Sequence, residues 1–247
     1  MSTILGIVEW DRDLTLAING SESLFWDNLM IVCTNTFAWS FLIVMLLFIL
    51  FKNNSVKDTL MILLTIGVMI FVADRLCSGF VKPFVARWRP TQDPDIMYLV
   101  DTVRNYRGGR FGFFSGHACN TTCVAMFLSW IFRSRKLTIV LFIWAAIATF
   151  TRLYLGVHYV GDVTVGAICG CTIGYLFYKA YHFLFKKELH THRLSEQYTE
   201  SGYLKSDIDL FMCTIFLNYI LLIIFSLSDW SFFIFSSNSI ISSIVFY

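Results

Sequence analysis

The chain has 247 residues, of which 57% are hydrophobic, 17% are aromatic and only 15% are charged. A soluble domain usually carries about 25% charged residues, so the composition argues against a soluble protein and is typical of one with several membrane spans. The formal net charge of +2 gives no argument for nucleic-acid binding, and no nucleic-acid partner is expected.

Residues 1–28 form an N-terminal segment that we expect to lie at the membrane interface. Its apolar residues, among them Ile7, Trp10 and Leu14, recur at helical spacing between acidic and polar residues. This pattern predicts an amphipathic helix on the surface of the lipid bilayer.

Residues 29–185 are predicted to be the membrane core of an all-α, polytopic helix bundle of about six spans. A span needs about 20 largely apolar residues, and apolar runs of roughly this length recur through the core. They cover residues 29–51, 59 to about 82, 117–132, 137–151 and 159–185. The longest polar interruption, residues 86–112, separates the second run from the third.

A hydrophilic loop, residues 186–207, follows the core and is expected in the cytoplasm. The C-terminal part, residues 208–247, contains a sixth apolar run over residues 208–227. The serine-rich segment 231–247 is short for a span, and the sequence leaves open whether it crosses the membrane.

Lysines and arginines in short loops predict the orientation in the membrane. They gather in residues 52–58, 133–136 and 186–193, which fall on one side by helix counting. The positive-inside rule makes that side cytoplasmic. The polar interruption then lies on the extracytoplasmic face, although it is itself basic and supports this orientation only if its arginines serve chemistry.

The first candidate site segment contains Lys82 and Arg89-Pro90. A separation of seven residues is two helical turns, which predicts that both cations project from one face of a helix that Pro90 ends. Arginine suits bidentate contacts to phosphate and lysine suits a point-charge contact. The alternative is a basic anchor for lipid headgroups.

The second segment, Ser115-Gly116-His117, opens the third apolar run. A helix N-terminus offers free N–H groups and a positive dipole end to a phosphate. Gly116 lets the backbone approach an oxyanion, Ser115 adds a hydroxyl, and His117 is placed to exchange a proton. The alternative for such a histidine is a structural role.

The third segment contains Arg152, His158 and Asp162. The histidine and the aspartate are four residues apart and would share one face of a helix. The carboxylate would then hold one ring nitrogen and leave the other free to attack. Arg152 adds a third cation, and a purely structural His–Asp pair is the alternative.

Lys-x6-Arg-Pro, Ser-Gly-His and Arg-x5-His-x3-Asp occur in this order. Together they resemble the three-part signature of the type 2 phosphatidic acid phosphatase superfamily, over roughly residues 60–180. Two positions depart from the usual family pattern, because Phe114 replaces a proline and Thr151 replaces a serine. Neither position supplies a candidate site residue.

The resemblance implies that His158 attacks phosphorus and forms a phosphohistidine, that Asp162 orients it, and that His117 protonates the leaving oxygen and then activates water. It also implies a set of phosphate-binding residues. These are Lys82, Arg89, Ser115, Gly116 and Arg152. Three cations supply the positive charge that a metal supplies elsewhere, so neither a metal nor a cofactor is expected.

The resemblance also implies a membrane lipid phosphate as substrate and the bacterial cytoplasmic (inner) membrane as location. Undecaprenyl diphosphate is expected first, as the commonest task of such bacterial relatives, with lipid A and phosphatidylglycerol phosphate as alternatives. A phosphotransferase, a vanadate-dependent haloperoxidase and a non-catalytic membrane protein are the competing classes. The oligomeric state stays open.

Three other patterns have simpler interpretations. The seven cysteines lie in or beside apolar runs and are expected to pack rather than to form disulfides or hold a metal. His190 and His192, with His182 nearby, are expected in a solvated loop. Gly166, Gly170 and Gly174 recur every four residues and predict close helix packing within the chain, with a dimer face as the alternative.

Overall fold

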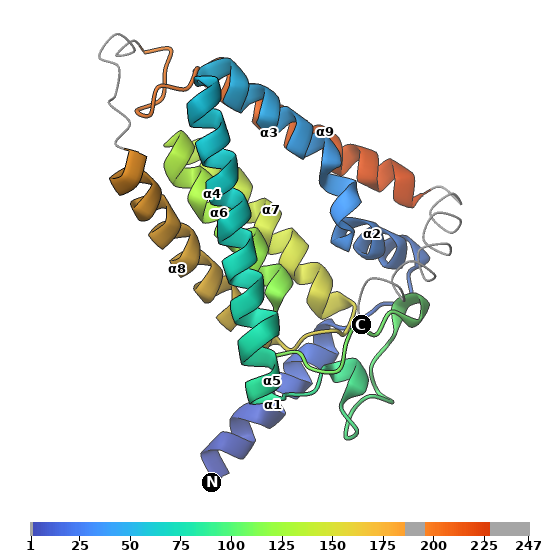
Figure 1. The fold of residues 1–247 in the computed structure, drawn as a ribbon. Coiled ribbons are helices and arrows are strands. Elements are labelled where there is room, and N and C mark those ends of the chain that lie inside the picture. The colour runs from blue at the N-terminus through green and yellow to red at the C-terminus, as the bar shows by residue number, and fades with distance from the viewer. Residues whose placement is uncertain (1, 186–195, 228–247) are drawn as a thin grey trace.

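The computed structural model describes residues 2–185 and 196–227, and within them all regular structure is helical. The long helices form an elongated bundle, with α1 projecting from one end (Figure 1). The helices are α1 (Ser2–Ile18), α2 (Leu24–Thr34), α3 (Ser40–Asn53), α4 (Val56–Asp74), α5 (Lys82–Val85), α6 (Gly116–Phe132), α7 (Arg135–Tyr154), α8 (Val160–Phe185) and α9 (Lys205–Ser226).

Five helical segments of the described residues are long and apolar enough to cross a membrane. They are Thr36–Asn53, Val56–Val85, Arg135–Tyr154, Val160–Phe185 and Lys205–Ser226. The 17-residue helix α6 lies among them and packs on α4, α7 and α8. The predicted all-α membrane bundle of about six spans is therefore confirmed.

The first apolar run differs from the prediction. It is not one helix over residues 29–51, because α2 ends at Thr34 and a short 3₁₀ turn precedes α3. Asn35 adopts an extended conformation, and its side chain accepts a hydrogen bond from the N–H of Phe37 at 2.9 Å. Such short polar side chains compete with the helix for backbone hydrogen bonds, a break that hydropathy does not register.

The second run continues as predicted past Asp74. A π-helical segment, Arg75–Val81, joins α4 to α5 and extends the apolar helix to Val85. The helix ends at Val85, and the next residue, Ala86, is left-handed with a φ of 50°. π-Helical turns are concentrated at functional sites, and this one leads directly to Lys82.

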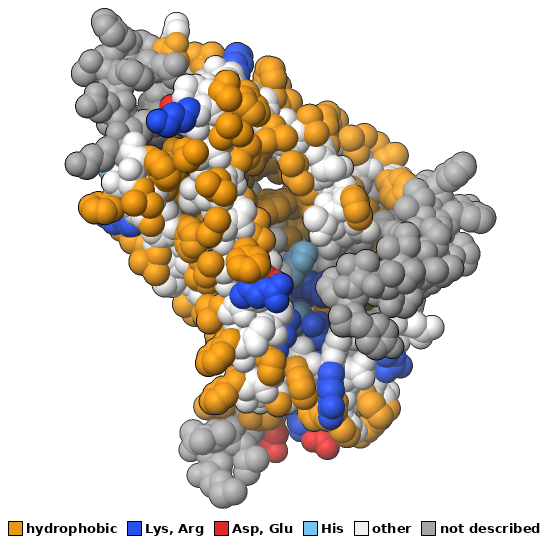
Figure 2. Space-filling model, in the orientation of Figure 1, with side chains coloured by type: hydrophobic (Ala, Val, Ile, Leu, Met, Phe, Trp, Pro, Cys, Tyr) orange, Lys and Arg blue, Asp and Glu red, His pale blue; other side chains and the backbone are white. Residues whose placement is uncertain are grey.

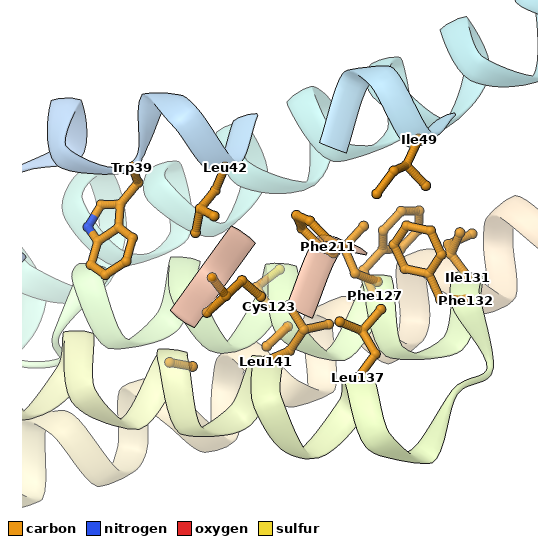
Figure 3. Packing of buried hydrophobic residues seen from close by; sticks show 14 of the residues in the cluster. Trp39, Leu42, Ile49, Cys123, Phe127, Ile131, Phe132, Leu137, Leu141 and Phe211 are labelled. Carbon is orange, nitrogen blue, oxygen red and sulfur yellow. The ribbon is translucent and has the colours of Figure 1, made fainter. Parts of the chain in front are cut away.

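The largest apolar core lies between α3, α6, α7 and α9 (Figure 3). Ile49, Phe127, Phe132 and Leu137 are fully buried in it. All seven cysteines are free thiols, and Cys33, Cys77, Cys119 and Cys123 are buried among apolar side chains, whereas Cys213 is exposed.

The glycine stripe of α8 faces α6. A methyl group on Gly166 would lie 2.6 Å from the carbonyl oxygen of Ser115, and one on Gly170 would overlap Thr122 and the carbonyl of Cys119. The stripe therefore serves packing within the chain, because only glycine lets the two backbones approach so closely.

The α3–α4 and α6–α7 connections lie at the end of the bundle opposite α1 (Figure 1). They contain two of the three basic groups on which the predicted orientation rests. Lys52 pairs with Asp207 at 2.7 Å, and Arg133 donates to the hydroxyl of Tyr178 at 3.1 Å. His190, His192 and the segment 231–247 fall outside the described residues.

Candidate active site

Three separate chain segments meet at the end of the bundle near α1. They are the α5 end with the strand-like residues after it, the N-terminus of α6, and the turn between α7 and α8. All eight residues that the sequence analysis selected lie on these segments or on the helix ends that border them.

His158 lies in the turn before α8, so it does not share a helix face with Asp162 as predicted. The two residues nevertheless meet, because Asp162 occupies the first turn of α8. His158 Nδ1 lies 3.5 Å from Asp162 Oδ2, and the two side chains are 2% and 0% exposed. This distance is within the range of an ion pair but is too long for a hydrogen bond.

The other ring nitrogen of His158 faces Arg89, whose Nη1 lies 3.3 Å from Nε2. Arg89 is fixed by the carbonyls of Phe111 and Val157, to which it donates at 3.1 and 3.3 Å. Burial, and then the charges of Arg89 and Arg152, hold the pKa of His158 well below its ordinary value. Burial beside Arg152 lowers the pKa of Arg89 to about 10, so the guanidinium stays charged at neutral pH.

Lys82 and Arg89 converge by a different route from the one predicted. The helix ends at Val85 rather than at Pro90, and Arg89 lies in an extended conformation with a φ of −76° and a ψ of 154°. The left-handed residue Ala86 turns the chain back toward the site. Lys82 Nζ would lie 3.9 Å from a methyl group on Gly116, so it reaches the N-terminus of α6.

Arg152 extends from the last turn of α7 and is 8% exposed. It donates to the hydroxyl of Thr34 at 2.6 Å and to that of Tyr106 at 3.2 Å. The positive charge of Arg152 lowers the pKa of Tyr106. Sequence reasoning missed Tyr106, because a lone tyrosine in a polar loop carries no local signal of a site.

The N-terminus of α6 forms the remaining side of the site. Ser115 is fully buried as the N-cap of α6, where its hydroxyl accepts from the N–H of Ala118 at 3.4 Å. Its own N–H donates to the carbonyl of Asp162 at 3.0 Å, which ties α6 to α8. The buried Nε2 of His117 has no hydrogen-bond partner within the described part of the chain.

Sequence reasoning also missed two residues that surround Asp162. Arg87 donates to Asp162 at 2.9 Å and to Asp11 of α1 at 2.7 Å. Arg87 stands inside the first motif segment, two residues before Arg89, and this proximity was its only signal. Asp11 lies in a helix that composition assigns to the membrane surface.

Lys, Arg and His side chains gather in a hollow beside α4 and α5, and apolar side chains of the bundle border it on one side (Figure 2). Lys82, Arg89 and Arg152 are near enough to His158 to disfavour its protonation. Three cations around a neutral, carboxylate-backed imidazole can bind a phosphate group and present a nucleophile to it. Among the described residues no group of three or more His, Cys, Asp or Glu side chains is arranged to hold a metal ion.

The fold and the site together define a membrane helix bundle with a cationic, histidine-containing pocket at one end. Residues 62–186 match the family model of the PAP2 superfamily. The chain belongs to the PAP2 superfamily, as its three motifs predicted, and it is a membrane lipid phosphatase.

Two curated relatives are each described as a lipid A 4'-phosphatase. The relative from Bacteroides thetaiotaomicron is 42% identical over 173 residues, which cover 70% of this chain and 77% of the relative. The relative from Porphyromonas gingivalis is 35% identical over 175 residues, which cover 71% and 74% of the two chains.

A solved structure shares the fold. The crystal structure of a transmembrane PAP2-type phosphatidylglycerolphosphate phosphatase from Bacillus subtilis matches with a TM-score of 0.56 at 22% sequence identity. The match covers 74% of this chain and 90% of that chain.

Proposed function

We propose that the enzyme removes a phosphate from lipid A through a phosphohistidine formed on His158. The main support for this chemistry is the position of the buried His158, whose Nε2 faces Arg89 and whose Nδ1 faces Asp162. The substrate class follows the two relatives that share 42% and 35% identity over most of their length.

In the first step, His158 Nε2 attacks phosphorus and a P–N bond replaces the P–O bond to the lipid. The negative charge of the bound phosphate favours the imidazolium form of His117, which gives its proton to the leaving lipid oxygen. Asp162 accepts from the Nδ1–H of His158 and stabilises the positive charge that develops on the ring.

In the second step, a water molecule attacks the phosphohistidine while His117 takes its proton. The P–N bond breaks, free phosphate leaves and both histidines return to their starting states. Lys82, Arg89 and Arg152 stabilise the phosphate oxygens throughout, with the hydroxyl of Ser115 and the N–H of Gly116 as neutral donors. These cations make a metal unnecessary for charge stabilisation.

The hollow beside α4 and α5 supports entry of the lipid from the side of the bundle (Figure 2). The apolar side chains on its border suit the acyl chains of a lipid, and its cationic interior suits the phosphate. We place the enzyme in the bacterial inner membrane with this site on the extracytoplasmic face, because the basic loops lie at the opposite end of the bundle.

The test is phosphate release by the purified enzyme in detergent from lipid A, undecaprenyl diphosphate and phosphatidylglycerol phosphate. We expect the highest kcat/KM for lipid A and a loss of more than about 1,000-fold in kcat for His158→Ala, since nucleophile and cradle act as a unit. His182→Ala is the matched control, because His182 stacks on Tyr178 at the far end of α8.

Each outcome of this panel has one meaning. Preference for undecaprenyl diphosphate or phosphatidylglycerol phosphate would overturn the lipid A assignment and leave the chemistry intact. Full activity of His158→Ala would overturn the chemistry. A phosphorylated acceptor lipid in place of free phosphate would identify a phosphotransferase.

A further inference from the structure

Helix α1 turns two polar side chains inward, which a helix lying only on the membrane surface has no reason to do. Asp11 is 7% exposed and Thr15 is fully buried. The Asp11 carboxylate accepts from the N–H of Gly161 at 2.9 Å, and the Thr15 hydroxyl accepts from the N–H of Val160 at 3.2 Å. Helix α1 therefore caps the free N–H groups of α8 from outside that helix.

The Asp11 carboxylate lies directly against Gly161 of α8. A methyl group at this position would lie 2.9 Å from Asp11 Oδ2, so a larger residue would displace the carboxylate from the N–H groups of α8. The Thr15 hydroxyl also donates to the carbonyl of Asp11 within α1 at 2.7 Å, which orients the hydroxyl oxygen so that it can accept from Val160. The junction is thus built from both helices.

Arg87 connects this junction to the site. Its Nη2 pairs with Asp11 Oδ2 at 2.7 Å and its Nη1 with Asp162 Oδ1 at 2.9 Å. The guanidinium also lies 4.0 Å from the centre of the Tyr159 ring. The remaining oxygen of Asp162 accepts from the N–H of Tyr159 at 3.1 Å and is the one that faces His158.

The charges of this group have a direct consequence for His158. Asp11, Arg87 and Asp162 together carry one net negative charge, which is available to an imidazole that becomes positive on phosphorylation. Without Asp11, the charges of Arg87 and Asp162 would cancel. Arg87 would also be free to bind both oxygens of Asp162 and draw the carboxylate away from the histidine.

We propose that Asp11 of α1 is a positioning residue of the phosphatase reaction, acting on His158 through Arg87 and Asp162. The inference rests on the proposed role of His158 and extends it to a helix that lies outside the family match at residues 62–186. Helix α1 is then part of the catalytic machinery as well as an amphipathic segment.

The experiment compares Asp11→Asn with Asp13→Asn in the purified full-length enzyme, with lipid A as the probe. Asp13 lies on the same helix, is exposed, and loses the same charge. We expect Asp11→Asn to lower kcat by about 10-fold to 100-fold, by analogy with the loss of the outer partners that orient metal-bound histidines. KM should change by less than about threefold, because Asp11 touches no substrate, and Asp13→Asn should match the wild type.

A structural role and a positioning role are separated by thermal melting and by a second variant. If Asp11→Asn does not fold, Arg87→Lys decides, with the same fall in kcat at nearly constant KM. If both fold, the double variant should lose no more than the worse single one, since the two residues act in series. A kcat for folded Asp11→Asn within twofold of the wild type would overturn the proposal, as would losses that multiply.

Failure of this inference and failure of the proposed function give different results. An inactive His158→Ala beside a fully active Asp11→Asn removes only the role of α1. An active His158→Ala removes the phosphohistidine, and the role of α1 with it.

Discussion

His158 combines two properties that rarely occur together, because it is buried and yet surrounded by cations. Both burial and the charges of Arg89 and Arg152 disfavour the protonated ring, so the imidazole stays neutral well below pH 6.5. A neutral ring is the nucleophilic form. The same environment would bind a phosphate, whose negative charge offsets the repulsion among the cations.

The lowered pKa of His158 predicts a loss of stability in acid. Below the ordinary histidine pKa of about 6.5, the unfolded chain binds a proton that folded His158 does not. The free energy of unfolding should therefore fall by up to about 1.4 kcal/mol for each pH unit below 6.5 through this group alone. The measurement is the melting temperature in detergent between pH 7.5 and 5.

The control for this experiment is His158→Gln, which keeps a polar side chain of similar size and cannot titrate. Its melting temperature should fall less steeply in acid than that of the wild type. Equal slopes for the two proteins would show that His158 binds its proton in the folded state as readily as in the unfolded state. That result would contradict the inference that the His158 imidazole is neutral in the folded enzyme.

At the scale of elements, the N-termini of α6 and α8 are held together by close backbone contacts. Ser115, the cap of α6, donates its N–H to Asp162 of α8, and the glycine stripe of α8 lies against α6. This packing sets the distance between His117 on one helix and His158 before the other. A site assembled from two helix ends is only as precise as the interface between the helices.

Gly170→Ala should destabilise the enzyme through this interface. The added methyl group would overlap Thr122 and the carbonyl of Cys119, and backbone atoms cannot move aside cheaply. Overpacking of this kind costs about 1–3 kcal/mol. Gly67→Ala on α4 is the matched control, because nothing lies within 4 Å of its methyl group.

Thermal melting in detergent checks both glycine variants. Gly67→Ala should equal or exceed the wild type, since alanine favours a helix by about 1 kcal/mol over glycine. A Gly170→Ala enzyme as stable as Gly67→Ala would mean that α6 and α8 are not in close backbone contact at Gly170.

At the scale of the whole molecule, the two ends of the bundle carry two different groups of basic side chains. Apolar side chains such as Phe48, Leu64 and Ile168 are more than half exposed along its length, as expected of helices whose outer faces contact lipid. Lys52 and Arg133 lie at one end, and the cations around His158 lie at the other. The two basic groups therefore have different surroundings, although composition counts them alike.

The proposed orientation predicts which end an impermeant thiol reagent reaches. In a variant without the seven natural cysteines, Tyr98→Cys should be labelled in intact spheroplasts, because Tyr98 is 74% exposed in the polar segment beside the site. Lys57→Cys, at the opposite end of the bundle, should be labelled only after permeabilisation. The reverse pattern would place the site in the cytoplasm.

Much of the fold was predictable from the sequence because membrane insertion depends on local composition. A run of about 20 apolar residues needs no partner to identify it as a span. Helices α7, α8 and α9 and the continuous helical segment Val56–Val85 begin and end within a few residues of the prediction. The break at Asn35 was missed, since Thr34 and Asn35 are too few to lower the hydropathy of the run. The contact that uses Thr34 comes from Arg152, 118 residues away.

The three motifs by themselves determined which side chains gather at the site and the class of reaction that they suit. The tertiary structure decided how they gather: Arg89 reaches His158 from an extended segment beyond the helix, Tyr106 holds Arg152, and Arg87 joins Asp11 to Asp162. The physical reason is that hydropathy and motif spacing are properties of a short stretch of sequence. A hydrogen bond such as that from Arg87 to Asp11, which are 76 positions apart, forms only after the helices have packed.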